Sequence, residues 1–150
     1  MLANTRAEPD DDAAKKRRRL IAETVRREGM VAILDSQRAL VSPDVADDVW
    51  ERVASIVASQ PPEAVAAMSL GLADRPDSRP DLPSIDVPTL VITSTDDQLM
   101  PQELSNTMAA AIPSADLALI NGAGHLSNME RPDEFTGSLM KHLQRCGVAA

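Results

Sequence analysis

Two ionisable side chains lie where an open parallel sheet places its chemistry. Asp97 follows the apolar run 87–93, and His125 follows the shorter run 117–120 and a Gly-x-Gly loop. Active residues in such sheets lie just past the carboxyl ends of the strands, so we expect these two side chains to meet. A histidine that takes a proton and an aspartate that fixes its tautomer are the base and orienter of a nucleophilic triad.

Each of these assignments has an alternative. Asp96 is the neighbouring candidate acid, and one of the two aspartates could simply cap or solvate the loop. A lone histidine is more often structural than functional, but the order strand, Gly-x-Gly, histidine, helix favours a functional His125. The second histidine, His142, has no such context, and we predict a surface residue of the last helix.

Alternating strands and helices must position these residues. The β-branched run predicts a buried parallel strand near 87–94, and a second strand is predicted near 116–121. Pro101 and Pro132 each begin a predicted helix, because proline fits the first helical turn. The order strand, helix, strand, helix implies a right-handed parallel unit and an α/β fold.

The N-terminal half shows helical periodicity and no strand pattern. Acidic residues before basic ones predict a helix over 11–28 that ends at Gly29, and a shorter helix follows over 30–40. Ser42-Pro43-Asp44 has the pattern of a helix start, with a serine cap and proline at the first helical position. Pro61-Pro62-Glu63 predicts another start, and residues 74–83 form a Pro- and Asp-rich connector.

Charge and composition exclude several classes of function. The formal net charge is −8, which argues against a general nucleic-acid binder; the basic run 15–19 is predicted to be a solvated helix face. One cysteine, Cys146, allows no internal disulfide and no cysteine zinc site. The longest apolar runs have five residues, whereas a membrane span needs about 18, so no membrane partner is expected. The N-terminus also lacks the apolar segment of a secretory signal. We therefore expect a cytoplasmic protein.

No cofactor or metal is expected. Gly122 and Gly124 lack the third glycine of a dinucleotide-binding loop, and the sequence holds no Walker motif. His125 and His142 lie 17 residues apart without helical pairing, which makes no metal site.

Two segments carry a family resemblance. The segment VPTLVI (87–92), followed by Asp97 and Pro101, resembles the acid-bearing strand of the α/β-hydrolase superfamily. The second segment is similar to the histidine strand and final helix of that fold, and it comprises IPSA (112–115), GAGHL (122–126), Glu130, Pro132 and Phe135. The most similar members are of the 3-oxoadipate enol-lactonase-like and methyl-ester carboxylesterase-like kinds.

The resemblance implies the C-terminal portion of an α/β-hydrolase fold. It implies a remnant of a core strand over 1–10, a helical lid and linker over 11–83, and the C-terminal part of the core over 84–150. Asp97 would be the triad acid and His125 the base. One departure is local, because the family often has glycine where Ser94 stands.

Ser69 offers a tempting nucleophile that we reject. Residues 67–71 read A-x-S-x-G, a variant of the nucleophile elbow, and the order Ser69, Asp97, His125 matches that of the family. An elbow must follow a buried strand, however, and residues 61–66 have the pattern of a helix start. The separation of 28 positions between Ser69 and Asp97 is also too short for the intervening elements of the fold.

We therefore expect a partial hydrolase with the acid and the base for ester or lactone hydrolysis, but without the nucleophile elbow and the oxyanion hole. The isolated chain is predicted to be inactive. Its partners would be a small ester or lactone, the missing N-terminal half, or a second copy of itself. The alternative is a non-catalytic binding or assembly module derived from a hydrolase.

Overall fold

The computed structural model describes residues 1–148, and the chain divides into two compact units that interleave along the sequence. The sheet unit comprises residues 1–7, 39–45 and the chain from Arg79 onward. The helical unit comprises residues 8–38 and 46–78. Residues 39–45 therefore belong to the sheet unit, although helices of the other unit precede and follow them in the sequence.

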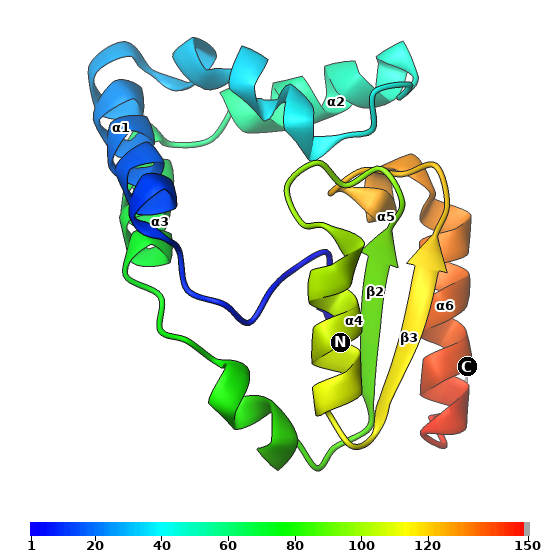
Figure 1. Cartoon of the computed structure of the whole chain (residues 1–150). Helices are drawn as coiled ribbons and strands as arrows, with labels where there is room; N and C mark the ends of the chain where they lie inside the picture. Colours follow the sequence, from blue (N-terminus) through cyan, green and yellow to red (C-terminus); the bar gives the residue numbers. More distant parts are fainter. Residues whose placement is uncertain (149–150) are drawn as a thin grey trace. The chain divides into compact units, whose positions relative to one another are not determined.

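The sheet unit is built on three parallel strands in the described part of the chain. They are β1 (Leu2–Ala3), β2 (Thr89–Ser94) and β3 (Ala115–Ile120), in the order β1-β2-β3 (Figure 1). The strands β2 and β3 pair along their whole length, from Thr89 opposite Ala115 to Ser94 opposite Ile120. The two adjacent parallel strands predicted from the sequence are thus confirmed.

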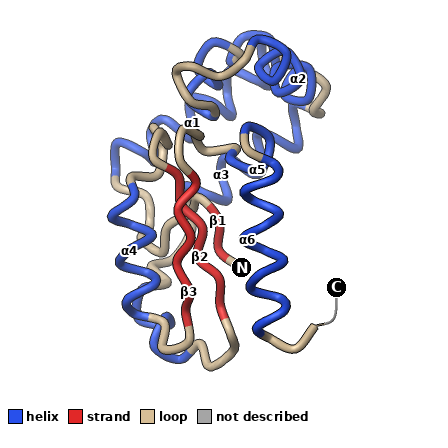
Figure 2. The backbone as a smooth tube through the Cα atoms, turned by 90° about the vertical axis from the view of Figure 1, so that its right-hand side faces the viewer, coloured by secondary structure: helices blue, strands red, loops and turns tan. Residues whose placement is uncertain are grey.

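Helices cover both faces of this sheet. Figure 2 shows α4 (Gln102–Ala111) on one side and α6 (Pro132–Arg145) on the other. Successive β2 side chains point to opposite faces. Val91 belongs to the cluster with Met108 and Ile112, and Ile92 belongs to the cluster against which Phe135 packs. The predicted helix starts at Pro101 and Pro132 are confirmed.

The helical unit contains α1 (Asp12–Glu28), α2 (Asp47–Ala58) and α3 (Pro62–Ala73). The helix α1 begins where the Asp11 side chain accepts the N–H of Ala14 at 2.6 Å, and it ends at Gly29, whose φ of 79° favours glycine. The helices α1 and α3 pack against each other (Figure 1). Their shared core contains Ala22, Val25, Met30, Ile33 and Ala66.

Two short segments differ from the prediction. Residues 30–40 form two 3₁₀ helices, Met30–Ile33 and Asp35–Leu40, in place of one helix. The helix start predicted at Ser42 is wrong, because α2 begins at Asp47. The Ser42 hydroxyl and N–H both bind the Glu130 carboxylate, so this serine does not cap a helix.

Short helical turns also occur where no helix was predicted. The one-turn helix α5 (Ser127–Glu130) precedes α6, and a 3₁₀ helix over Arg79–Ser84 lies at the end of the predicted connector. Segments of four to six residues are too short to show a helical period in the sequence. Over the described residues, no helix combines the length and apolar character that crossing a membrane requires.

Candidate active site

The ends of β2 and β3 bring Asp97 and His125 to the same edge of the sheet. The two strands end opposite each other, at Ser94 and Ile120. The loops that follow are tied together, because the N–H of Asp96 donates to the carbonyl of Ala123 at 3.0 Å. The residues after each strand are thereby held at one end of the parallel pair.

The two side chains form a direct hydrogen bond. His125 Nδ1 lies 3.0 Å from Asp97 Oδ2, which confirms the predicted proximity. The Asp97 side chain is fully buried, whereas 23% of the His125 side chain is exposed. With the proton on Nδ1 donated to Asp97, the Nε2 atom is left as an acceptor. This is the arrangement in which an imidazole can take a proton from a reacting group.

Asp97 uses its two oxygens for two tasks. Its Oδ1 atom accepts the N–H groups of Leu99 and Met100, each at 2.9 Å, which closes the loop after β2. Its Oδ2 atom faces His125. The same carboxylate therefore caps the loop and contacts the imidazole, while the alternative acid, Asp96, has an exposed side chain.

The pKa of Asp97 lies below its ordinary value. Burial is the largest single influence and raises this pKa, but hydrogen bonds from the His125 side chain, the Met100 N–H and the Asn4 amide lower it, and together they prevail. Asp97 is therefore a carboxylate at neutral pH, ready to stabilise a positively charged imidazole.

Asn4 is a central part of the site that the sequence analysis missed. Its buried amide Nδ2 donates to Asp97 Oδ2 at 3.0 Å and to the Ser94 hydroxyl at 2.6 Å. Its Oδ1 atom accepts the Ser127 hydroxyl at 2.7 Å. The backbone of Asn4 has a φ of 45°, a left-handed conformation that asparagine tolerates better than most residues. The residue after β1 thus fixes the oxygen of Asp97 that faces His125.

Ser94, the local departure from the family pattern, is integrated into this network. Its hydroxyl donates to the Gly124 carbonyl at 2.6 Å while accepting the Asn4 amide. It is buried at the end of β2. A serine here therefore joins the end of the acid strand directly to the loop that carries His125.

Glu130 and Gly124 hold the histidine loop from the other side. The Glu130 carboxylate accepts the Gly124 N–H at 2.8 Å and the Ser42 N–H at 3.1 Å. Gly124 also approaches another backbone segment closely, since a Cβ added to it would lie 2.4 Å from the Val41 carbonyl carbon. The loop before His125 is thus wedged between the segment 41–42 and α5.

The remaining sequence candidates lie elsewhere. Ser69 is within α3, where its hydroxyl donates to the Arg18 carbonyl at 3.0 Å. The prediction of a surface position for His142 is wrong, because only 8% of this residue is exposed. Its Nδ1 atom lies 3.2 Å from Asp116 Oδ2 on β3, so the imidazole ring of His142 packs against the sheet.

The site borders an open cavity of about 370 Å³ lined by Asp97, Asp96, Asp44 and neighbouring residues. Among residues 1–148, no group of three or more His, Cys, Asp or Glu side chains is arranged to hold a metal ion.

The lowered pKa of Asp97 predicts how stability depends on pH. Because the folded-state pKa is below the ordinary value, the ionised carboxylate stabilises the fold above pH 4, and this contribution disappears as the pH falls through the folded-state pKa. We expect Asp97→Asn to make the free energy of unfolding less sensitive to acid over this window. Denaturant unfolding followed by circular dichroism at a series of pH values measures it.

The matched control for this measurement is Asp96→Asn, which removes the neighbouring exposed carboxylate. It should retain the acid sensitivity of the unmodified chain. Equal acid sensitivity in the chain with Asp97→Asn would contradict the ionised, hydrogen-bonded state of Asp97.

The fold is that of an α/β hydrolase, and sequence comparison agrees. A model of the alpha/beta hydrolase family matches residues 2–137, so the chain belongs to this family. A thermophilic esterase from Thermogutta terrifontis is similar, with 39% identity and a TM-score of 0.92 over 96% of this chain and 54% of the esterase. The enol-lactonase from Burkholderia xenovorans LB400 has 29% identity and a TM-score of 0.78, over 95% of this chain and 54% of that protein.

A curated relative has a different named activity. The putative carbamate hydrolase RutD of Stutzerimonas stutzeri is 40% identical over 75 residues, which is 49% of this chain and 28% of that protein. The chain thus spans about half the length of the solved relatives, and its match to the curated relative covers a smaller share.

Proposed function

We propose that Asp97 and His125 are the acid and the base of a hydrolytic triad, and that the chain is the C-terminal portion of an ester or lactone hydrolase. The observation that carries this proposal is the 3.0 Å contact between His125 Nδ1 and Asp97 Oδ2 at adjacent strand ends. Family membership supports it, because this fold provides the strand order in which an acid and a histidine converge.

In this mechanism a serine attacks the carbonyl carbon of the substrate while His125 Nε2 takes the hydroxyl proton. Asp97 holds the ring by its Nδ1–H and stabilises the imidazolium that forms. His125 then protonates the leaving alcohol, and a water molecule repeats the sequence to release the acid. Two backbone N–H groups outside these elements would stabilise the oxyanion.

We infer that the nucleophile belongs to a segment outside residues 1–148. Ser69 lies in the interior of a helix that follows another helix, whereas an elbow serine lies at a sharp turn between a strand and a helix. Ser69 as a residue is 95% buried, and its hydroxyl donates to the Arg18 carbonyl of α1. These contacts support a structural role for Ser69 in the helical unit.

The substrate class follows from the chemistry of the pair. Esters, lactones and carbamates share a carbonyl carbon bonded to an oxygen leaving group, and one acid–base pair serves all three. Esters and lactones are the first candidates because an esterase shares 39% identity and a TM-score of 0.92 with this chain. Carbamates are the second candidate, because the local identity to a putative carbamate hydrolase reaches 40%.

A chimera tests this proposal. The part of the Thermogutta terrifontis esterase that precedes the matched region is fused to Met1 of this chain, and hydrolysis of p-nitrophenyl acetate is measured. We expect the isolated chain to hydrolyse this ester no faster than background and the chimera to hydrolyse it measurably. The chimera with Ser69→Ala should retain at least half of the chimera's activity. Ester turnover by the isolated chain that Ser69→Ala abolishes would refute the assignment.

The same chimera also distinguishes the hydrolase from the alternative, a non-catalytic binding or assembly module. That module would be favoured if circular dichroism shows that the chimera is folded but it has no activity, while the isolated chain binds an acyl ligand. A panel containing a lactone and a carbamate alongside the ester then ranks the substrate classes.

We also propose that the isolated chain self-associates. Among the described residues, β1 and β3 each pair only with β2, and Leu117 and Leu119 of β3 are half-exposed. Unpaired strand edges and exposed apolar side chains promote association. We expect oligomers in size-exclusion chromatography with light scattering. A sharp monomer peak together with cooperative unfolding would contradict this expectation.

A further inference from the structure

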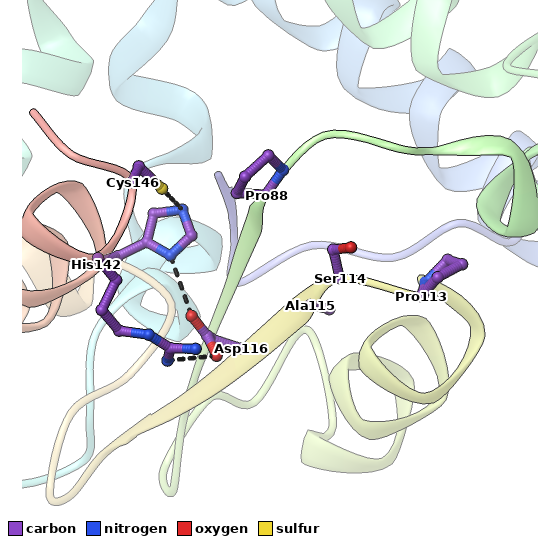
Figure 3. Close-up of a pocket in the computed structure, with 8 residues that line it drawn as sticks. Pro88, Pro113, Ser114, Ala115, Asp116, His142 and Cys146 are labelled. Atoms are coloured by element: carbon purple, nitrogen blue, oxygen red, sulfur yellow. Dashed lines mark hydrogen bonds and ion pairs between the residues drawn. The ribbon is translucent and has the colours of Figure 1, made fainter.

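A second cluster of reactive side chains lies at the opposite end of β3 from the loop of His125. Asp116 is the second residue of β3, and His142 and Arg145 belong to the last turn of α6, which Cys146 follows directly. These four residues line a cavity of about 370 Å³ with Pro88, Pro113, Ser114 and Ala115. Figure 3 shows Asp116, His142 and Cys146 around the cavity. The cavity size is within the range of small-ligand sites.

The three side chains at the centre form a chain of contacts. The exposed thiol of Cys146 lies 3.7 Å from His142 Nε2, and Nδ1 of the same ring lies 3.2 Å from Asp116 Oδ2 (Figure 3). The His142 residue is 92% buried, so its ring is held in place. A nucleophile beside a base that a third group orients is the signature of an activated nucleophile.

Asp116 is held in its charged form. The hydrogen bond from His142 is the largest influence, and with the hydrogen bond from Arg145 it lowers the pKa of Asp116 below its ordinary value, against a smaller opposing effect of burial. The Arg145 guanidinium lies 2.6 Å from Asp116. A carboxylate at this position favours the tautomer with the proton on Nδ1, which leaves the Nε2 lone pair of His142 facing the thiol.

The surroundings of the thiol favour one kind of chemistry. Acyl transfer needs N–H groups that converge on an oxyanion, and two backbone N–H groups of this cavity already have partners: that of Cys146 donates to the His142 carbonyl and that of Ala115 to the Ile112 carbonyl. Pro88 and Pro113 have no N–H. Thiol–disulfide exchange needs no oxyanion site, because sulfur displaces sulfur directly.

We propose that Cys146, His142 and Asp116 form a site that reacts with small-molecule disulfides. The Cys146 sulfur attacks one sulfur of the disulfide as His142 Nε2 takes the thiol proton. A new S–S bond forms to Cys146, the original S–S bond breaks, and the leaving thiolate receives the proton from His142. The disulfide is the oxidant, and the products are a mixed disulfide and a free thiol.

The mixed disulfide persists on this chain because the sequence contains no second cysteine to resolve it. An external thiol must reverse the reaction, which makes Cys146 a reversible modification site. The site stands apart from the proposed hydrolase function, since Asp116 lies near the start of β3 and His125 follows its end.

The experiment exposes the full chain to oxidised glutathione at neutral pH and follows the mixed disulfide by intact mass spectrometry. A matched control moves the single thiol to an exposed helix position without a neighbouring imidazole, as the double variant Cys146→Ser, Ser55→Cys. A free cysteine is only a few per cent thiolate at neutral pH, so general-base assistance should raise the rate at Cys146 at least about tenfold above this control.

A second variant tests the base. His142→Gln, with helical content retained by circular dichroism, is expected to lower the rate at Cys146 by about tenfold. A rate at Cys146 within about twofold of the Ser55→Cys control would overturn the proposal whether or not His142→Gln folds. An unchanged rate in folded His142→Gln would overturn it equally, since the thiol would then react without the imidazole.

Discussion

His125→Ala in the esterase chimera is expected to lower kcat/KM for p-nitrophenyl acetate by about 10⁵-fold. Loss of the base removes most of what the whole triad contributes, because the serine and its base act as a unit. Asp97→Asn is expected to cost about 10⁴-fold, since an amide in that position favours the wrong tautomer of the imidazole. Steady-state kinetics on purified variants measures both losses.

Asp96→Asn is the matched control for these losses. It changes the adjacent carboxylate, whose side chain is exposed and which contributes only its backbone N–H to the loop. Its kcat/KM should stay within about twofold of the unmodified chimera. If either His125→Ala or Asp97→Asn retained activity within tenfold, the residue changed in that variant could not be part of the triad.

Gly124→Ala is expected to lower the free energy of unfolding by about 3 kcal/mol, a cost typical of severe overpacking. The added Cβ would lie 2.4 Å from the Val41 carbonyl carbon and 2.5 Å from the Ser42 nitrogen. Both are backbone atoms and cannot rotate away as a side chain could. The loop must therefore shift, which also breaks the hydrogen bonds from Ser94 and to Glu130 that position His125.

Gly137→Ala is the same substitution at another glycine, and it is expected to raise the free energy of unfolding. Gly137 lies within α6, and a Cβ there would meet no atom within 4 Å. Alanine in an open helical position is expected to stabilise the fold by about 1 kcal/mol. Denaturant titration of both variants measures the two changes, and destabilisation of equal size by both would show that close contact at Gly124 is not the cause.

The pairing of Asp97 with His125 could be predicted because it follows from local patterns. Each residue comes directly after a β-branched or apolar run, and parallel strands align their carboxyl ends. The proline-initiated helices after these strands were predicted for a similar reason, since proline at the first turn is a local signal.

The roles of Asn4 and Ser42 could not be predicted, because they depend on contacts between residues far apart in the sequence. Asn4 lies 90 and 93 residues before the Ser94 and Asp97 side chains that it binds, and nothing in the segment 1–8 indicates that role. Ser42 lies in a sequence pattern that is typical of a helix cap. In the folded chain, however, its N–H and hydroxyl donate to the Glu130 carboxylate, 88 residues later. A positive φ and buried polar contacts are properties of the folded chain, so only the structure shows them.

His142 illustrates the same limit on the last helix. The ring is buried because it binds Asp116, and strand pairing is what brings Asp116 to that position. Its helix carries a mixed polar pattern that indicates exposure as readily as burial. Whether a residue on a partly polar helix face is buried thus depends on which residues of the sheet lie opposite it.

Labelling with a fluorophosphonate tests most directly whether Asp97 and His125 serve a nucleophile from another segment. The reagent is applied to the isolated chain, to the chimera and to the chimera with His125→Ala, and the adduct is located by peptide mass spectrometry. We predict an adduct on the elbow serine of the esterase-derived segment that depends on His125, and none on the isolated chain. An adduct on Ser69 of the isolated chain would contradict this division of the triad.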